Sequence, residues 1–343
     1  MEKMKTSFDF SLREMNTFGM KVNSRVYIEI GTKEELVQAV LRADLEGWPL
    51  LVLGEGSNVL MRGDFDGAVL RLTGLDQVRI IHEDGDAVHL RVGAGLNWDR
   101  LVRHCARQGY AGLESLAGIP GTVGAAPVQN VGAYGCEVGQ RLRQIEVYDR
   151  LEHGFRLIAA EDCRFSYRMS LFKSDWRERY IIVSVTFVLR RAADARVSDP
   201  KIREELGLRD DTPIALGRIG EAVRAVRGRR LPDPGKLGNA GSFFMNPIVS
   251  ATHAQALARR YPQMPVYPVS ADRAKISAGW LIEQCGYRGY RSGNVGVYWD
   301  NPLVVVNYGD ACAAEILAFG RLLKEAVLAK FSVRLHMEPS VIG

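Results

Sequence analysis

Hydrophobic and polar residues along the first half of the chain form short runs that are typical of β-strands. Residues 88–92 alternate between apolar and polar positions, as a strand with one buried face does. Other runs are apolar over about the length of one strand. We expect these further strands at residues 27–30, 50–53, 69–72, 142–159 and 180–189.

Capping residues predict two helices between these strands. Thr32 followed three residues later by Glu35 forms a capping box, and the helix that it opens should end near Gly47. Asn97 is expected to cap a second helix, whose apolar positions share one face and which stops at Gly109.

The pattern changes after residue 190. Residues 194–211 are polar and are expected to form a linker or excursion, and Thr212-Pro213 then predicts the start of a helix that ends at Leu231-Pro232. Its apolar face is Ile219, Ala222, Val223 and Val226. Later helices are expected at residues 278–284 and 311–331, and strands at 294–298 and 303–307.

This change of pattern places a domain boundary near residue 200, between a first domain at residues 1–200 and a second domain that follows it.

Composition narrows the class of protein. Of 343 residues, 47% are hydrophobic and 25% are charged, which suits a folded protein without long disorder. No apolar run approaches the roughly 20 residues of a membrane-spanning helix, and residues 1–10 lack a signal core, so we expect a cytoplasmic protein. Five scattered cysteines and six histidines without metal-ligand spacing predict neither a disulfide framework nor a metal site. The net charge of +5 does not favour nucleic-acid binding.

Two glycine-rich loops stand out. Residues 54–58 (Gly-Glu-Gly-Ser-Asn) follow a predicted strand, and residues 115–136 contain five glycines but no charge. The first loop has Val59 where a dinucleotide-binding fingerprint has its third glycine. Each loop is therefore either a tight turn or a nest of backbone N–H groups for a diphosphate. Their pairing favours the second interpretation, with Ala125 and Ala126 as a wall for a flat ring.

Two polar residues and one helix each allow two interpretations, and a third polar residue allows only one. Arg168, among aromatic residues, is an ordinary salt-bridged arginine or a fixed cation that grips a carboxylate. Ser242, after Gly241, is a turn residue or a proton-donating hydroxyl. Glu338 by itself is an ordinary solvated carboxylate. Residues 218–230 hold five basic residues against one acid, which fits a solvated helix face or a diphosphate site.

Seven segments in order resemble the UDP-N-acetylenolpyruvoylglucosamine reductase family. No one of them is specific alone, but their spacing matches from about residue 16 to the C-terminus. The segments are residues 16–19 (Asn-Thr-Phe-Gly), 53–60 (Leu-Gly-Glu-Gly-Ser-Asn-Val-Leu), 112–121 (Gly-Leu-Glu-Ser-Leu-Ala-Gly-Ile-Pro-Gly), 129–135 (Gln-Asn-Val-Gly-Ala-Tyr-Gly), 167–172 (Tyr-Arg-Met-Ser-Leu-Phe), 238–244 (Gly-Asn-Ala-Gly-Ser-Phe-Phe) and 278–282 (Ala-Gly-Trp-Leu-Ile).

The resemblance implies a fold and a reaction. It implies an α+β protein with a vanillyl-alcohol-oxidase/PCMH-type FAD-binding domain of two α+β subdomains, at about residues 1–70 and 71–200. An α+β substrate-binding domain at 201–330 would follow, and residues 331–343 would form a C-terminal segment that returns to the active site. It also implies that NADPH reduces non-covalently bound FAD, whose N5 then delivers hydride to the enolpyruvyl ether of UDP-N-acetylglucosamine to give UDP-N-acetylmuramate, a precursor of peptidoglycan. No nucleic acid, membrane or obligate protein partner is expected.

The resemblance further implies the roles of individual residues. Arg168 and Glu338 would stabilise the enolate, and Ser242 would donate the proton to the α-carbon. The expected cofactor contacts are Gly54, Glu55, Gly56, Ser57, Asn58, Ile119, Gly121, Thr122, Gly124, Ala125, Gly132, Ala133 and Tyr134. The expected substrate contacts are Tyr167, Arg227, Arg230, Asn246, Tyr267 and Asn301.

Some residues depart from the family pattern, and two other functions compete with the one that the resemblance implies. Residues 194–211 contain no tyrosine, although some relatives have a substrate-capping tyrosine there, and Arg230 stands where lysine is frequent. A flavoprotein oxidase of the same cofactor fold is the alternative enzyme, but the two glycine-rich loops lack a histidine that could tether FAD. A basic binding module without catalysis would explain residues 218–230 but not the two loops.

Overall fold

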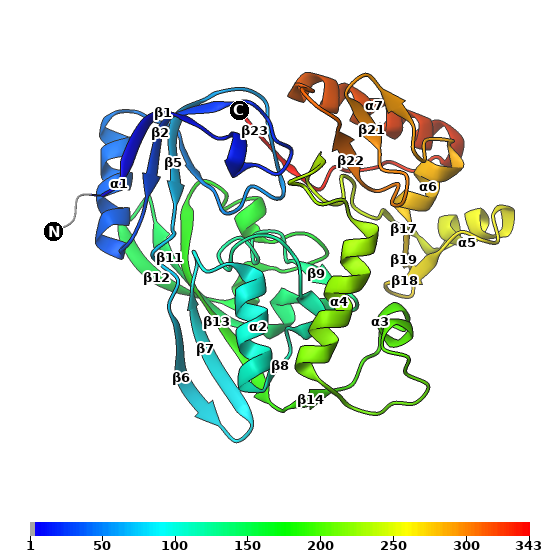
Figure 1. Cartoon of the computed structure of the whole chain (residues 1–343), viewed down its shortest axis with the longest axis horizontal. Coiled ribbons are helices and arrows are strands. Elements are labelled where there is room, and N and C mark those ends of the chain that lie inside the picture. The colour runs from blue at the N-terminus through cyan, green and yellow to red at the C-terminus, as the bar shows by residue number, and fades with distance from the viewer. Residues whose placement is uncertain (1–3) are drawn as a thin grey trace. The chain divides into compact units, whose positions relative to one another are not determined.

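The computed structural model describes residues 4–343 (Figure 1). Two compact units divide these residues, and each unit contains several chain segments. Unit 1 comprises the residues up to Phe10, Ser24–Glu55 and Asp66–Arg229. Unit 2 comprises Ser11–Asn23, Gly56–Phe65 and Arg230–Gly343. These limits differ from the domain limits expected from the sequence, which stay a prediction.

The first sheet of unit 1 carries helix α1 (Lys33–Leu45). Its strand order is β1-β2-β5-β3, with β1 (Thr6–Ser11), β2 (Asn23–Glu29), β3 (Leu50–Val52) and β5 (Phe65–Arg71). The buried residues of α1 recur at helical spacing and pack into the same core as β2. The Thr32 hydroxyl accepts the Glu35 backbone N–H at 3.2 Å, so the expected start of α1 is confirmed.

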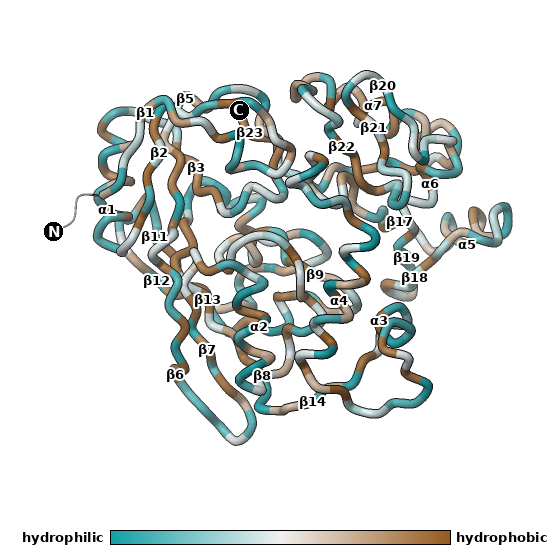
Figure 2. The backbone as a smooth tube through the Cα atoms, in the orientation of Figure 1, coloured by the Kyte–Doolittle hydropathy of each residue, from teal (hydrophilic) through white to brown (hydrophobic). Residues whose placement is uncertain are grey.

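The second sheet of unit 1 has β13 at its centre. Its main path is β12-β11-β13-β7-β6, all neighbours are antiparallel, and β8 adds to one end of β13. Hydrophobic residues run along these strands in Figure 2, and β13 is buried along most of its length, as its apolar run predicts. The strands are β6 (Val78–Asp84), β7 (Ala87–Gly93), β8 (Tyr110–Ala111), β11 (Leu142–Asp149), β12 (Gly154–Ala159) and β13 (Tyr180–Arg191).

Helices α2 (Trp98–Gln108) and α4 (Leu216–Arg230) lie side by side in unit 1 (Figure 1). The Asn97 side chain caps α2 by accepting the Arg100 N–H, and Gly109 ends it with a φ of 71°, so both predicted signals are confirmed. The predicted apolar face of α4 is buried. A short hairpin of β9 (Gly132–Ala133) and β10 (Cys136–Glu137) forms the end of the second glycine-rich loop.

One expectation for residues 194–215 is wrong. The polar stretch, expected as a linker or excursion, contains helix α3 (Pro200–Glu205), which the Asp199 side chain caps. Thr212-Pro213, however, does not start a helix. Strand β14 (Asp194–Ala195) pairs with β15 (Ile214–Ala215), and this pairing holds the backbone extended until α4 begins at Leu216.

Unit 2 contains three small sheets. Two are antiparallel, with orders β16-β22-β21-β20 and β17-β19-β18, and in the third β23 pairs with β4 in parallel. The strands are β4 (Val59–Met61), β16 (Gly238–Asn239), β17 (Ile248–Ser250), β18 (Val266–Pro268), β19 (Arg273–Ile276), β20 (Arg291–Ser292), β21 (Val295–Val297), β22 (Val305–Asn307) and β23 (Ser340–Ile342).

Three helices complete unit 2: α5 (Ala251–Arg260), α6 (Ala278–Gln284) and α7 (Ala313–Phe331). The sequence predicts α6 and α7 close to these bounds, but α5 has no counterpart among the expected helices. Short 3-10 helices lie at Arg13–Met15, Glu114–Leu116, Val138–Arg141, Ala160–Cys163 and Leu171–Lys173. Among residues 4–343, no helix is both long and apolar enough to cross a membrane, and no cluster of three metal-ligating side chains occurs.

Candidate active site

The two glycine-rich loops contact one another in unit 1. A Cβ on Gly54 would lie 2.9 Å from the Thr122 hydroxyl and 3.6 Å from the Ala125 Cβ, so only glycine lets the loops approach this closely. Thr122 is buried and Ala125 is exposed. Ala126 is only 2% exposed and packs into the core, whereas Ala125 faces outward, and their role as a wall for a flat ring stays a prediction.

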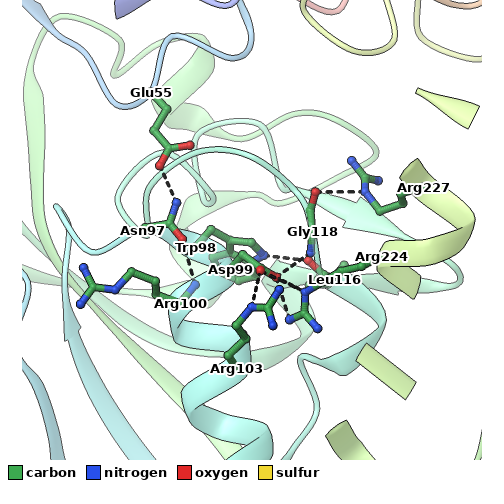
Figure 3. A network of polar contacts seen from close by, with 10 residues as sticks. All are labelled: Glu55, Asn97, Trp98, Asp99, Arg100, Arg103, Leu116, Gly118, Arg224 and Arg227. Carbon is green, nitrogen blue, oxygen red and sulfur yellow. Dashed lines mark hydrogen bonds and ion pairs between the residues drawn. The ribbon is translucent and has the colours of Figure 1, made fainter. Parts of the chain in front are cut away.

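The Glu55 carboxylate ties these loops together. One oxygen accepts the Gly121 backbone N–H at 2.8 Å, and the other accepts the Asn97 side-chain amide (Figure 3). The Asn97 oxygen meanwhile caps α2, so one amide joins the loop to the helix. Glu55 therefore holds Gly121 in place, at a φ of +130° that favours glycine.

Asp99 fixes the start of the second loop from the first turn of α2. Its carboxylate accepts the Gly118 backbone N–H at 2.7 Å and pairs with Arg224 of α4 at 2.8 Å (Figure 3). Burial acts to raise the pKa of this carboxyl, but the hydrogen bonds from Arg224, Gly118 and Arg103 outweigh it and leave the pKa below its ordinary value. Asp99 is therefore ionised at neutral pH.

Arg227 reaches the same glycine from α4. Its Nε donates to the Gly118 carbonyl oxygen at 3.2 Å, and its side chain is half-buried. Burial lowers the pKa of the Arg227 guanidinium, and the charge of Arg168 lowers it further, whereas Tyr134 and Asp99 oppose the shift. Two cations and a tyrosine of unit 1 thus share one electrostatic environment.

Arg168 occupies a strained position in a two-residue turn. Ser166 and Met169 exchange backbone hydrogen bonds at 3.0 and 3.1 Å, which leaves Tyr167 and Arg168 at the tip. Arg168 has a φ of 57°, which costs a non-glycine residue about 1–2 kcal/mol. Its guanidinium donates to the Gly132 carbonyl at 2.6 Å, which orients the side chain along the β9–β10 hairpin.

This hairpin brings other predicted cofactor contacts beside Arg168. Gly132 and Ala133 form β9, and Tyr134 follows in the turn with a φ of 50°. A Cβ on Gly132 would lie 3.0 Å from an Arg168 terminal nitrogen, so the arginine packs directly on the glycine backbone. Left-handed backbone at both Arg168 and Tyr134 is the kind of strain that gathers at functional sites.

Gly56 begins the part of the first loop that belongs to unit 2. It has a φ of +62°, and a Cβ there would lie 2.0 Å from the Met15 carbonyl oxygen, so no other residue fits. Ser57 and Asn58 follow, both half-buried. The Asn58 side chain donates to the backbone carbonyl of Glu338 at 3.4 Å. The backbone carbonyl of Asn58 accepts the Ser340 N–H at 3.0 Å.

Ser242 and Glu338 lie on paired segments of unit 2. The Glu338 N–H donates to the Phe243 carbonyl at 3.0 Å, Met245 donates to the His336 carbonyl at 2.9 Å, and Phe244 bridges to Met337. Ser242 itself follows Gly241, whose φ is +66° and whose N–H donates to the Asn239 side chain. The Ser242 side chain is half-buried next to two buried phenylalanines.

The residues of unit 2 that are expected to contact substrate differ in their hydrogen bonds and in their exposure. The Asn246 side chain accepts the Ala278 N–H at 2.9 Å, which ties it to the start of α6. The Asn301 side chain accepts the Leu303 N–H at 3.2 Å in a local turn. Tyr267 is 51% exposed, with the Lys275 ammonium 6.0 Å from its ring, and Arg230 is exposed at the end of α4. Substrate contact by these four residues stays a prediction.

The structure thus forms two groups of candidate residues. Unit 1 brings together the loops at Gly54 and Gly118–Ala125, the hairpin at Gly132 and the side chains of Arg168 and Arg227. Unit 2 brings Asn58, Ser242 and Glu338 together. Sequence analysis missed Asp99 and Arg224, because an acid in a first helical turn and an arginine on a polar helix face carry no local signal of their long-range pairing.

The residues of unit 1 fit FAD on two observations. Gly54 and Gly124 let the loop backbones pack closely on their neighbours, since a Cβ on Gly54 would meet Thr122 and a Cβ on Gly124 would lie 2.6 Å from the Ala94 Cβ. Moreover, Gly54 and Glu55 donate their backbone N–H groups to no other group among the described residues. Two consecutive N–H groups beside a half-buried arginine suit a diphosphate.

Comparison with known proteins defines the class first. Residues 24–151 match the model of an FAD binding domain, and residues 233–342 match the model described as UDP-N-acetylenolpyruvoylglucosamine reductase, C-terminal domain. The chain is therefore an FAD-binding oxidoreductase with a separate C-terminal domain, which confirms the expected fold class: a vanillyl-alcohol-oxidase/PCMH-type FAD-binding domain followed by an α+β domain.

Its relatives specify the family. The UDP-N-acetylenolpyruvoylglucosamine reductase of Xanthomonas axonopodis pv. citri is 45% identical over 97% of this chain and 95% of the relative. That of Chromobacterium violaceum is 42% identical over 97% of this chain and 98% of the relative. The crystal structure of the enzyme from Thermus caldophilus covers 99% of both chains at 25% identity, with a TM-score of 0.69. The chain belongs to the UDP-N-acetylenolpyruvoylglucosamine reductase family.

Proposed function

We propose that the chain reduces the enolpyruvyl ether of UDP-N-acetylglucosamine to UDP-N-acetylmuramate, with FAD as cofactor and NADPH as hydride donor, in the synthesis of peptidoglycan precursors. The observation that carries this proposal is the 45% identity to a reductase of that name over nearly the full length of both chains. The residues with proposed chemical roles fall into the two groups described above.

The substrate determines which groups the site needs. Its alkene is conjugated with a carboxylate, so a hydride that adds to the terminal carbon builds negative charge on the α-carbon and the carboxylate. Bound FAD, once reduced by NADPH, supplies that hydride. The chain must then stabilise the developing charge and deliver one proton to the α-carbon.

Arg168 is the proposed cation for the substrate carboxylate. Its turn and its bond to the Gly132 carbonyl hold the guanidinium before any ligand arrives. A fixed, forked donor stabilises a carboxylate that gains charge without a cost for reorganisation at that moment. Its strained backbone supports a functional role, because selection for stability alone would favour glycine there.

Ser242 is the proposed proton donor, and Glu338 assists it. The bridge between residues 243–245 and 336–338 sets both side chains on adjoining backbone in unit 2. Serine is a weak acid, but the enolate that it protonates is a strong base, so correct placement outweighs its high pKa. The buried rings of Phe243 and Phe244 beside it help to exclude water as a competing donor.

Arg227 and the free backbone N–H groups of Gly54 and Glu55 are the proposed sites for diphosphate. Three compounds in this reaction carry a diphosphate: FAD, NADPH and the nucleotide substrate. The half-buried guanidinium and the backbone donors match the charge and geometry of such groups. Contacts with FAD by the remaining loop residues, and with substrate by Tyr167, Arg230, Asn246, Tyr267 and Asn301, belong to the same proposal.

Anaerobic half-reactions test the proposed function. Purified protein should be yellow, and NADPH should bleach its flavin spectrum. Mixing the reduced protein with the enolpyruvyl nucleotide should then restore the oxidised spectrum and form the lactyl ether. A flavin that NADPH reduces but the nucleotide does not reoxidise would contradict the proposed substrate. Flavin that stays on the protein after acid precipitation would contradict non-covalent binding.

The proposal also covers the cellular location and the partners expected from the sequence. We expect the enzyme to act in the cytoplasm, without nucleic acid, membrane or an obligate protein partner. Fractionation of cells of the source organism would test the location, and a purified single chain that sustains turnover would exclude an obligate partner.

A further inference from the structure

The carboxylate of Asp99 collects hydrogen bonds from three parts of unit 1. It accepts the Gly118 N–H at 2.7 Å, a terminal nitrogen of Arg224 at 2.8 Å and the Nε of Arg103 at 2.9 Å. The Nε of Arg224 also lies 3.0 Å from each carboxylate oxygen, so the two groups meet along the full edge of the guanidinium. Only 23% of the Asp99 side chain and 19% of the Arg224 side chain are exposed, so water screens this pair weakly.

This pair sets α4 against the loop that begins at Gly118. Arg224 and Arg227 are three residues apart in α4 and therefore lie on the same side of the helix. Fixing Arg224 on Asp99 places Arg227 where its Nε donates to the Gly118 carbonyl at 3.2 Å. Asp99 thus holds the N–H of Gly118, and Arg227 holds its C=O (Figure 3).

The two arginines differ in what remains available to a ligand. The charge of Arg224 is neutralised by its ion pair with Asp99. Arg227 has no carboxylate partner among residues 4–343, and its two terminal amino groups donate to no described residue. These groups present four N–H donors beside a loop of glycine backbone. A guanidinium in this setting can accept an anion from outside the chain.

We propose that Asp99 and Arg224 are positioning residues that orient Arg227 and the Gly118 loop for the diphosphate of a ligand. This inference rests on the proposed function, which supplies three diphosphate compounds: FAD, NADPH and the UDP-linked substrate. Asp99 touches none of them and acts through Gly118 and Arg227. Its negative charge is essential, because it keeps Arg224 from competing for the same anion.

The test uses the full-length Asp99→Asn variant, which keeps the shape of the side chain but loses the charge. We would measure kcat per bound flavin, the KM for NADPH and for the enolpyruvyl nucleotide, and the Kd for FAD after flavin removal. A charge-assisted hydrogen bond contributes enough that its loss should raise at least one of these KM or Kd values by about 10- to 100-fold. The kcat per bound flavin should stay within about threefold, and the constant that changes identifies the diphosphate.

Asp44→Asn is the matched control. Asp44 pairs with Arg150 at 3.1 Å, and their side chains are 35% and 22% exposed, so this pair resembles that of Asp99 in burial, but it joins α1 to the residue after β11 and contains no residue of the two glycine-rich loops. A role limited to stability would lower the folded fraction in both variants and leave all three constants unchanged. That result for Asp99→Asn would overturn the inference.

Arg224→Lys supplies a second test if Asp99→Asn fails to fold. Lysine keeps the charge but cannot meet the carboxylate along two bonds, so the same constant should rise by a smaller factor. Unchanged constants in this variant would also overturn the inference. Failure of the proposed function would look different, because the nucleotide would then not reoxidise the reduced wild type. The Kd for FAD does not depend on the nucleotide, so comparing this Kd between wild type and Asp99→Asn would still test whether Asp99 orients a diphosphate site.

Discussion

The main-chain N–H of Glu338 donates to the carbonyl oxygen of Phe243 at 3.0 Å, which joins the C-terminal segment to the residue that follows Ser242. Asn58 adds a second attachment, since its side chain donates to the Glu338 carbonyl at 3.4 Å. Both contacts use the backbone of Glu338. They therefore fix the point on the backbone from which the glutamate side chain extends.

Ser242→Ala should separate the two half-reactions. Removal of a proton donor slows only the step that needs the proton, so reduction of the flavin by NADPH should be unchanged. Reoxidation by the enolpyruvyl nucleotide should slow by about 10²- to 10⁴-fold, which anaerobic stopped-flow absorbance would measure. Ser250→Ala is the control: that serine caps α5, so its loss should lower stability by about 1 kcal/mol and leave both rates unchanged. Equal slowing of both half-reactions by Ser242→Ala would contradict the assigned role.

Substitution of Arg168 should reveal the cost of its backbone conformation. Arg168→Ala and Arg168→Gly both remove the guanidinium and its bond to the Gly132 carbonyl. Only glycine adopts a φ of 57° without strain, so Arg168→Gly should be more stable than Arg168→Ala by about 1 kcal/mol in urea unfolding. Both variants should lose turnover of the nucleotide. An alanine variant as stable as the glycine variant would mean that the turn is unstrained.

Local sequence signals identified the elements that depend on local contacts. The cap at Asn97 and the stop at Gly109 place α2 correctly, because each acts within one helical turn. Thr212-Pro213 is an equally strong local signal, yet it fails. The pairing of β14 with β15 is long-range and keeps residues 214–215 extended, and tertiary pairing outweighs the preference of a single dipeptide.

The candidate site likewise has features that local sequence predicts and features that depend on long-range contacts. The sequence identified both loops of the cofactor region, because a high content of glycine can be recognised without a structure. No pattern showed that Asp99 would accept the Gly118 N–H, or that residues 243–245 would pair with 336–338. Those relationships depend on how distant segments fold together, so they came from the structure or, for Ser242 and Glu338, from resemblance to a family.

Gly124→Ala should weaken FAD binding. A Cβ at this position would lie 2.6 Å from the Ala94 Cβ, so the loop must move away from the end of β7. Overpacking of this kind costs about 1–3 kcal/mol. We expect a lower flavin content after purification and a higher Kd for FAD. Gly217→Ala is the control, since a Cβ there meets nothing within 4 Å and α4 should become slightly more stable. Full flavin retention by Gly124→Ala would show that FAD binding does not depend on the position of this loop.

Asp149→Asn should destabilise the protein in a pH-dependent manner. The Asp149 side chain is 1% exposed and accepts three hydrogen bonds from Arg179 and one from Arg156. The hydrogen bonds from Arg179 lower the pKa of this carboxyl despite its burial. A carboxyl whose pKa is lower in the folded state stabilises the fold above its unfolded pKa of about 3.9, and that stabilisation is lost as the pH falls through the folded value.

The difference in free energy of unfolding between wild type and Asp149→Asn should therefore be about 1–3 kcal/mol at pH 7 and should shrink below about pH 4. Urea titrations at several pH values would measure it. Asp66→Asn is the control: the Asp66 side chain is 78% exposed in its pair with Arg25, so solvent screening should keep its effect below about 1 kcal/mol at every pH. A difference for Asp149→Asn that grows on acidification would mean that the pKa of Asp149 is raised in the fold, contrary to the contacts with Arg179 and Arg156.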